Sequence, residues 1–558
     1  GLRPGMAGGG RTRGENRARY LQPFPYVSKV ELGKGNSLAL NGHPLDGVGT
    51  RLGDDWIPLG FSSNASVPAA AAVFAGYGIS SSELKYDDYA ASNTKDRIAI
   101  VFAGTPDGDN PHSQFVQAGQ VRFKAAAARA AGAKALLIIA NEDILPHDRL
   151  SQLTYDNAGE AGIPVIAISR ALAKQILNAE LTALQVAADA RTAASSPLRQ
   201  PIKEVSISLT VAVNRIESPS FNVVGILPGN DPKLKNEAIV IGAHYDHLGL
   251  GGEGSLAPRE GEIHHGADDN ASGTAGVLEL ARMFTQGPKP RRTIIFIAFS
   301  GEEEGLIGSN YYVNHPVVPL ANTVAMINMD MIGRLKDQKL SIGGVGTAQE
   351  WKDEIKRTQD SFTTPQTIPT SAGNHSSSST ASPFALTLNE DGYGPSDHSS
   401  FYSKQIPVLF FWTGTHNDYH KPSDTAEKIN YQGEARIVSF VANIVREMDK
   451  ADKRPTYTVA KSESQGRATG FRVYLGTIPN YADSNDGLLL DGVRDDSPAA
   501  KAGIKAGDKI VKLAGRDVKN VYDYTYALGE LKAGEEYEVE LMRSGLRITL
   551  KIRPEARK

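Results

Sequence analysis

Four apolar runs between residues 241 and 412 each lead into side chains that can bind a metal ion. The runs end at residues 243, 299, 329 and 412, and short continuous apolar runs are typical of buried strands in a parallel sheet. The carboxyl ends of parallel strands meet at one edge, where open α/β sheets bind their ligands. We therefore expect an α/β fold, with a mostly parallel mixed sheet flanked by helices and a site at that edge.

The candidate ligands are imidazoles and carboxylates. His244, Glu302, Glu303, Asp330 and His420 follow the runs, and a glycine-bounded turn at 266–273 adds Asp268 and Asp269. Taken singly, a strand histidine is more often a core residue, and paired glutamates usually mark a solvated face. Here the glutamates follow a buried run and precede a glycine-rich segment. Nitrogen and oxygen donors without sulfur suit zinc, with manganese or cobalt next, and the imidazoles make calcium a poor fit.

Three polar positions near these candidates need a separate interpretation. Asp246 stands two residues after His244, so on a continuous strand both side chains project from the same face. The histidine pair at 264–265 precedes the turn at 266–273, but the other candidates already form a complete set. The Ser-Asp-His sequence at 396–398 cannot build a catalytic triad, because a triad is a spatial arrangement that consecutive residues do not form. We interpret 396–398 as pocket or scaffold residues.

The five motifs together resemble those of metallopeptidase family 28, the co-catalytic two-zinc aminopeptidases of the aminopeptidase S and leucyl aminopeptidase type. The resemblance covers residues 200–450 and implies two zinc ions per chain. One ion would be held by His244, Asp330 and Asp269, and the other by Glu303, His420 and the same Asp269. The family places its bridging ligand directly before the Asn-Ala-Ser-Gly turn, which selects Asp269 over Asp268.

The same resemblance implies roles for two further residues. Asp246 would hold the His244 ring in its metal-binding tautomer. Glu302 would be the general base that takes a proton from the metal-activated water and returns it to the leaving amine. The family also implies a cis peptide bond between Asp269 and Asn270. The expected function is removal of N-terminal residues from peptides that have a free N-terminus.

Two other functions remain open at this point. One is a zinc carboxypeptidase or dipeptidase of related fold, which shares the His-x-Asp motif and the Glu-Glu pair. The turn at 266–273 favours the aminopeptidase group. The other is a catalytically silent protein that binds peptides through a C-terminal domain. The presence of Glu302 and of a full ligand set argues against it.

Two further domains are predicted around the peptidase domain. Residues 56–195 resemble a protease-associated (PA) domain of α+β type, through an alanine-rich helix stopped by Gly132 and a Gly-Ile-Pro-Val strand at 162–165. Residues 466–556 resemble a PDZ domain, a β-sandwich-like fold, through the segment 497–510. PDZ domains bind extended peptides or C-termini at a sheet edge. The loop at 474–477 reads Tyr-Leu-Gly-Thr and departs from the common Gly-Leu-Gly-Phe form.

The remaining segments are assigned to the peptidase domain. Residues 196–452 are its main part, and residues 1–55 are its N-terminal part. The chain begins without an apolar signal core, and a strand of the catalytic fold already starts near residue 20. We expect that an export signal and a first helix precede Gly1 in the full protein. The family resemblance implies a periplasmic or extracellular location.

Composition excludes several classes of function. At 558 residues the chain is too long for one domain. It contains no cysteine, which excludes disulfides, thiolate ligands and a cysteine nucleophile. The net charge is −3 without any basic block, so neither nucleic acid nor an anionic membrane surface is an expected partner. No run reaches the ~20 apolar residues of a membrane span.

Overall fold

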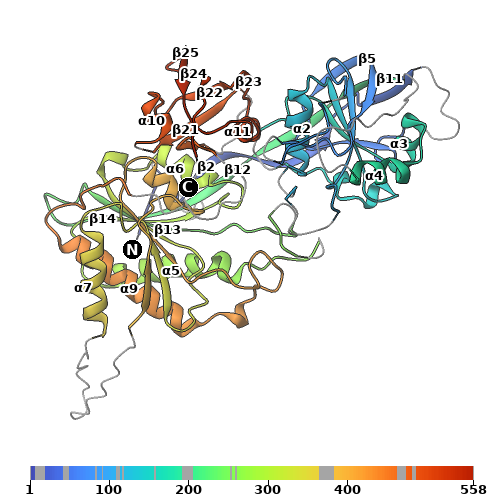
Figure 1. The fold of residues 1–558 in the computed structure, drawn as a ribbon. Helices are drawn as coiled ribbons and strands as arrows, with labels where there is room; N and C mark the ends of the chain where they lie inside the picture. Colours follow the sequence, from blue (N-terminus) through green and yellow to red (C-terminus); the bar gives the residue numbers. More distant parts are fainter. Residues whose placement is uncertain are drawn as a thin grey trace, which may run out of the picture. The chain divides into compact units, whose positions relative to one another are not determined.

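The computed structural model divides the chain into two compact units (Figure 1). It describes residues 2–6, 19–41, 50–81, 84–90, 92–108, 114–115, 118–155, 159–190, 205–251, 254–257, 261–363, 383–460, 473–480, 486–494 and 496–556. The first unit comprises Gly1–Pro25 and Pro219–Arg467, and the second comprises Tyr26–Ser218 and Ala468–Lys558. No helix in these described ranges is long and apolar enough to cross a membrane.

A mixed sheet forms the centre of the first unit. Its strand order is β1-β12-β14-β13-β15-β18-β16-β17, with β2 paired to β12 outside this path. The strands are β1 (Arg3–Pro4), β2 (Leu21–Leu32), β12 (Val213–Leu227), β13 (Ala238–His244), β14 (Thr293–Phe299), β15 (Thr323–Met329), β16 (Lys339–Gly343), β17 (Ala385–Leu388) and β18 (Val408–Trp412). The central strands β14, β13, β15 and β18 are parallel to one another. The predicted α/β fold with a mostly parallel mixed sheet is confirmed.

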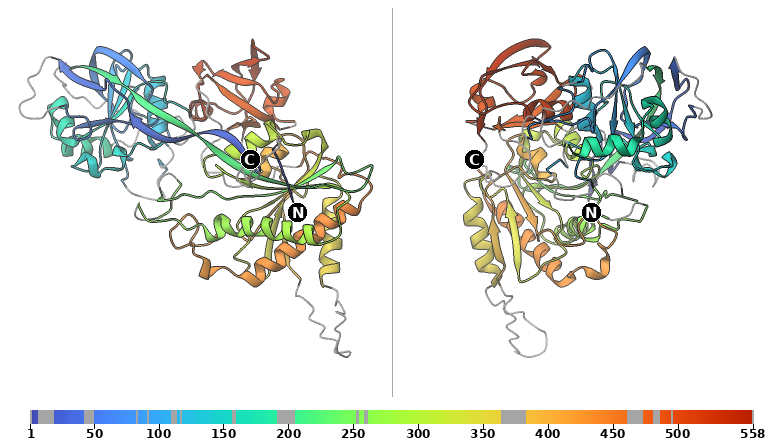
Figure 2. Two further views of the ribbon diagram at one scale, coloured as in Figure 1. Left: turned by 180° about the vertical axis from the view of Figure 1, so that it is seen from behind. Right: turned by 45° about the vertical axis from the view of Figure 1, so that its right-hand side comes forward.

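Helices cover both faces of the central strands, which is why β13, β14 and β15 are buried and almost entirely apolar. The helices are α5 (Gly273–Gln286), α6 (Ile307–Asn314), α7 (Trp351–Thr363), α8 (His398–Tyr402) and α9 (Tyr431–Lys450), with short helices η3 (Ala267–Ser272), η4 (Leu320–Asn322) and η5 (Ala426–Lys428). Figure 2 shows α5 and α9 along one side of the sheet. Ile239 and Ile241 pack with Leu280 of α5 and Val441 of α9. Val240, between them, packs on the opposite face.

The parallel strands deliver the candidate ligands to one edge. β13 ends at His244 itself, and β15 ends one residue before Asp330. β14 ends at Phe299, so the glutamate pair at 302–303 starts the turn that follows it. β18 ends at Trp412, and the loop after it carries His420. The chain therefore brings residues that are far apart in sequence to the carboxyl edge of four adjacent strands.

The second unit contains a sheet of its own within residues 26–218. Its order is β3-β11-β5-β8-β9-β10-β4. The elements are β3 (Ser37–Asn41), β4 (Trp56–Pro58), β5 (Ala65–Phe74), β6 (Ser80–Ser81), β7 (Tyr86–Asp87), β8 (Ile98–Phe102), α2 (Val121–Ala130), β9 (Ala135–Ile139), η1 (Leu145–His147), η2 (Arg149–Ser151), β10 (Val165–Ile168), α3 (Arg170–Leu177), α4 (Leu181–Asp189) and β11 (Ser206–Val211). Because β3 pairs with β11, Ser37–Asn41 belongs to this sheet, although the predicted division placed residues 1–55 in the peptidase domain.

The C-terminal part of the second unit is a small β-rich lobe. Its sheet has the order β20-β21-β22-β24-β25, with β23 paired to β22. The elements are β19 (Val473–Tyr474), β20 (Thr477–Pro479), β21 (Leu488–Val493), α10 (Pro498–Lys501), β22 (Lys509–Leu513), β23 (Arg516–Asp517), α11 (Val521–Gly529), β24 (Tyr537–Arg543), β25 (Leu546–Ile552) and β26 (Glu555–Ala556). The predicted domain boundaries at residues 195 and 466 lie outside the described residues.

Candidate metal centre

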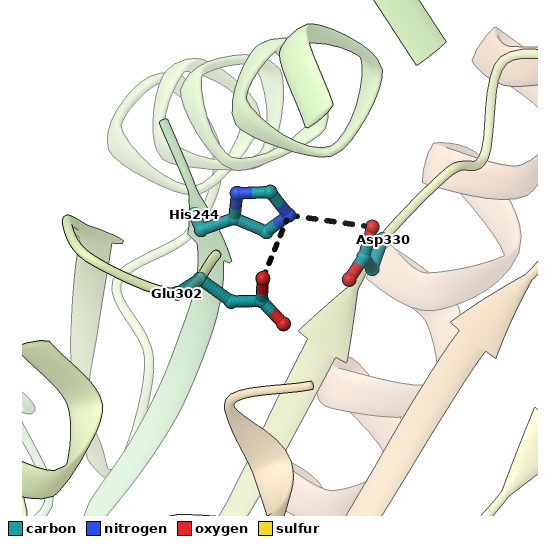
Figure 3. A group of neighbouring side chains, drawn as sticks. All are labelled: His244, Glu302 and Asp330. Carbon is teal, nitrogen blue, oxygen red and sulfur yellow. Dashed lines mark ion pairs between the residues drawn. The ribbon is translucent and has the colours of Figure 1, made fainter. Parts of the chain in front are cut away.

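His244 is the central side chain of the site (Figure 3). Its Nε2 atom lies 3.5 Å from Asp330 Oδ1 and 3.9 Å from Glu302 Oε2. The His244 side chain is 1% exposed. Within the described residues, neither His244 Nε2 nor Asp330 Oδ1 has a hydrogen-bond partner, although both atoms are buried. Buried polar atoms are almost always satisfied, so these two atoms point to a partner of another kind.

A second group of side chains lies beside the first and shares Asp269 with it. Asp269 Oδ1 is 3.3 Å from His244 Nε2, and Asp269 Oδ2 is 3.2 Å from His420 Nε2. His420 Nε2 is also 3.3 Å from Glu303 Oε2. The structure therefore brings together all five residues predicted as ligands, and Asp269 stands between the two imidazoles.

These separations fit ligands around a metal ion better than direct hydrogen bonds. Zinc bonds to nitrogen and oxygen are about 2.0–2.2 Å long, and two ligands in a tetrahedral arrangement then lie about 3.3–3.6 Å apart. The four pairs formed by His244 or His420 with Asp269, Asp330 and Glu303 are 3.2–3.5 Å apart. The donor types, the spacing and the unpartnered atoms fit zinc.

The carboxylates strongly favour positive charge at this site. Burial alone lowers the pKa of His420, but Asp269 and Glu303 overcome it and raise this pKa to about 10. Glu302 and Asp330 likewise raise the pKa of His244 well above its usual value, against the effect of burial. The same carboxylates would stabilise a divalent cation at the imidazole nitrogens.

Glu302 and Glu303 are neighbours in the chain but occupy different positions in the site. Glu303 Oε2 lies at ligand spacing from His420, whereas Glu302 Oε2 is 3.9 Å from His244 Nε2, farther than the other pairs. Burial, together with the neighbouring carboxylates, raises the pKa of Glu302 well above its usual range even though His244 lowers it. A carboxyl group with a raised pKa beside a metal site is suited to accept and return a proton.

Asp246 does not lie as the sequence predicted. β13 ends at His244, so Asp246 belongs to the following loop, and the prediction of one continuous strand face is wrong. His244 Nδ1 lies 3.1 Å from the backbone oxygen of Asp246 but 3.7 Å from its carboxylate. The backbone carbonyl therefore orients the ring. The Asp246 carboxylate instead accepts a hydrogen bond of 3.3 Å from the Glu303 amide.

The turn before α5 aims Asp269 at the site. Asp424 is buried, and its Oδ2 atom accepts hydrogen bonds from the amides of Asp268 and Asp269, at 2.8 and 3.1 Å. The peptide bond from Asp269 to Asn270 is cis, as expected from the family resemblance. Asn270 Nδ2 donates to the backbone oxygen of Met329, at 3.1 Å. These contacts fix the turn against the end of β15.

Two residues that contact the ligands were missed by the sequence reasoning. Ser396 Oγ donates a hydrogen bond of 2.7 Å to Asp330 Oδ2 and accepts one of 2.8 Å from Asn328. His247 Nδ1 lies 2.6 Å from Glu303 Oε1. Asn328 lies in β15, two residues before Asp330, but no sequence signal indicated that Ser396 would reach either residue. His247 follows Asp246 directly. Of the two histidines in the segment 241–247, it is the one to which the sequence analysis assigned no role.

Other polar residues near the site lie outside the ligand set. His264 Nε2 bonds to Ser255 Oγ at 2.8 Å. His398 is buried and stacks on Phe410, with ring centroids 4.4 Å apart. Burial lowers the pKa of His398 to about 3, which keeps the ring neutral. Because the Ser396 hydroxyl donates to Asp330, the 396–398 segment supports a predicted ligand and forms no triad.

Together these features define an α/β domain with a candidate metal-binding centre at the carboxyl edge of its parallel strands. Comparison with known families assigns this domain and the two lobes of the second unit. Residues 222–445 match peptidase family M28, residues 60–176 match the PA domain, and residues 474–553 match the PDZ domain. The chain thus carries a peptidase family M28 domain together with PA and PDZ domains, as the sequence motifs predicted.

Individual relatives are similar to parts of the chain. Aminopeptidase YwaD of Bacillus subtilis is 29% identical over 344 residues, which cover 60% of this chain and 61% of YwaD. Leupeptin-inactivating enzyme 1 of Streptomyces exfoliatus is 29% identical over 210 residues, covering 37% of this chain and 39% of that enzyme. The solved structure of BSAP, a zinc aminopeptidase from Bacillus subtilis, is 23% identical with a TM-score of 0.44, covering 79% of this chain and 88% of BSAP.

Proposed function

We propose that this chain is a zinc-dependent aminopeptidase that holds two zinc ions. The single observation that carries the proposal is the position of Asp269, whose two carboxylate oxygens face two different imidazoles at 3.3 and 3.2 Å. A carboxylate placed in this way can serve two ions at once. The aminopeptidase activity in the name of YwaD supports the choice of reaction.

Each ion would have its own ligands in addition to the shared carboxylate. His244 and Asp330 would complete one set, and His420 and Glu303 the other. When bound, two divalent ions lower the pKa of a water molecule and polarise a peptide carbonyl. All the remaining steps are assigned to the protein's own side chains.

Glu302 would carry the proton during hydrolysis. Its side chain is 9% exposed and lies beside His244, but its carboxylate stands farther from His244 than the ligands do, so its oxygens stay available for proton transfer. It would accept a proton from the attacking water and deliver it to the leaving amine. Glu303 cannot take this role, because its two oxygens face His247 and His420.

The preferred substrates would be peptides with a free N-terminus. Hydrolysis of chromogenic amino-acid amides tests this directly, with purified protein before and after dialysis against a chelator. We expect hydrolysis of free-amine substrates, loss of the rate after chelation and recovery when zinc is added back. Hydrolysis of N-blocked peptides alone would contradict the aminopeptidase assignment while leaving the metal centre intact.

The PDZ lobe would bind an extended peptide segment. β20 stands at the end of the strand order of its sheet, and PDZ domains take up peptides by adding a strand to such an edge. The Tyr-Leu-Gly segment at 474–476 directly precedes β20. Fluorescence anisotropy with a library of labelled C-terminal peptides tests this, and an absence of binding by every member would contradict it.

A further inference from the structure

His247 touches the metal centre without belonging to the predicted ligand set. It lies in the loop after β13, and its side chain is 11% exposed. Its Nδ1 atom is 2.6 Å from Glu303 Oε1. The other oxygen of the same carboxylate, Oε2, is 3.3 Å from His420 Nε2. The two oxygens of Glu303 therefore face two imidazoles at clearly different distances.

These two distances show that Glu303 makes a hydrogen bond with His247 but has the spacing of a shared metal ion with His420. Two tetrahedral ligands of one zinc ion lie about 3.3 Å or more apart, which matches Glu303 and His420 but not Glu303 and His247. A separation of 2.6 Å matches a short, charge-assisted hydrogen bond. His247 Nδ1 therefore carries a hydrogen atom and donates it to Glu303 Oε1.

The surroundings hold the His247 ring in this position. Its ring lies edge to face with that of His420, with centroids 5.8 Å apart. On another side it lies against Gly266, where an added Cβ atom would come within 2.7 Å of the ring. His247 Nε2 is buried and has no hydrogen-bond partner among the described residues. The ring is thus fixed by packing and by one strong bond, the bond to Glu303.

We propose that His247 is a positioning residue that restricts Glu303 to metal binding through Oε2 alone. The inference rests on the metal centre proposed above. With Oε1 bonded to His247, the Glu303 carboxylate cannot rotate to present both oxygens to an ion. Hydrogen bonds that orient a ligand in this way typically contribute 10–100-fold to metal affinity or activity.

Zinc binding to the full-length protein tests the proposal without relying on activity. The protein is stripped with a chelator, and zinc affinity is measured in competition with a chromogenic chelator for wild type, His247→Leu and His247→Asn. The asparagine amide can place an N–H near the position of Nδ1, whereas leucine keeps apolar bulk without a donor. The matched control is His264→Leu, since His264 is also buried but bonds to Ser255.

We expect two ions in wild type and one of them about 10–100-fold weaker in His247→Leu. His247→Asn should restore most of the affinity, and His264→Leu should bind as wild type. If His247→Leu does not fold, by circular dichroism, His247→Gln replaces it, because the glutamine amide corresponds to Nε2 and cannot reach Oε1.

Two results would overturn this inference alone. One is unchanged affinity for both ions in the variant that lacks the donor. The other is an asparagine variant as weak as leucine, which would mean that the imidazole itself is a ligand. A wild-type chain that takes up no zinc would overturn both this inference and the proposed function.

Discussion

Asp268 and Asp269 are adjacent in the chain, yet their carboxylates face in different directions. The oxygens of Asp269 lie 3.3 Å from His244 Nε2 and 3.2 Å from His420 Nε2. Asp268 Oδ1 instead accepts a hydrogen bond of 2.6 Å from the Gly333 amide, and its Oδ2 lies 3.1 Å from His416 Nε2. One carboxylate therefore faces the proposed metal centre, and the other ties the turn to the segment after β15.

Because the two carboxylates have different partners, Asp269→Asn and Asp268→Asn should differ in their effects on zinc binding and on stability. Asp269→Asn should lose zinc, because an amide nitrogen replaces the oxygen of one ligand set and both sets lose the negative charge of the carboxylate. Asp268→Asn should keep zinc but lower the melting temperature by a few degrees, since an impaired hydrogen bond at a buried group costs about 1–3 kcal/mol. Metal analysis and thermal melting of both variants distinguish these outcomes. Loss of zinc in Asp268→Asn alone would reverse the two roles.

The glutamate pair predicts a second contrast. Glu302→Gln should retain zinc and lose about 10²–10⁴-fold in turnover, because general acid–base catalysis is worth roughly that factor. Glu303→Gln should lose metal as well as turnover, because Glu303 lies at ligand spacing from His420. Metal content and rate are measured on the same preparations. A fully metallated Glu302→Gln with normal rate would contradict its role as the base.

Ser396 is predicted to control the affinity of the ion beside Asp330. Its hydroxyl donates to Asp330 Oδ2 at 2.7 Å, leaving Oδ1 to face His244. Ser396→Ala should weaken zinc binding by about 10–100-fold, as is typical when a bond that orients a ligand is removed. Ser400→Ala is the control, because Ser400 bonds to Ser309. Equal affinities in the two variants would show that the bond to Asp330 has no effect on the ion.

Lys124 predicts a pH dependence for the PA lobe. Its ammonium group is buried and donates to the backbone oxygens of Tyr77, Phe102 and Gly104 at 2.5, 3.0 and 2.8 Å. Burial lowers its pKa from 10.5 to about 7, partly offset by Asp88. The unfolded chain therefore binds more protons between pH 7 and 10.5, so stability should rise with pH across this window, by up to about 3–5 kcal/mol.

Hydrogen exchange of α2 measures this effect. After correction for the intrinsic rate at each pH, protection of α2 in wild type should increase from pH 7 to pH 9. Lys124→Met has no group that titrates at this position and should lose the increase, whatever its absolute stability. An identical pH trend in the two proteins would rule out Lys124 as the source.

Much of the fold can be predicted because strands buried on both faces are apolar throughout. The apolar runs that end at residues 299 and 412 coincide with β14 and β18, as the sequence indicated. The apolar runs also indicate that these strands are parallel. Parallel strands place their carboxyl ends at one edge of the sheet, so the candidate ligands that follow them meet there. The choice of Asp269 over Asp268 depended on family resemblance, since their separation appears only in the folded turn.

Contacts across long stretches of sequence could not be predicted in the same way. His247 and Glu303 are 56 residues apart, and Ser396 and Asp330 are 66 apart. The periodic spacing of side chains along a strand or helix cannot predict either contact, because each contact depends on how two loops lie against each other. Asp246 was misplaced for a related reason. Side chains alternate between the two faces only along a strand, and β13 ends at His244. Because the sequence does not mark this end, the alternation was wrongly extended to Asp246.

In the proposed centre, Asp269 would be shared by two ions. Anomalous diffraction from crystals grown with zinc, recorded on both sides of the zinc absorption edge, tests it most directly. We predict two peaks per chain, one beside His244 and Asp330 and the other beside His420 and Glu303, with Asp269 between them. A single peak, or peaks that do not contact Asp269, would contradict the account.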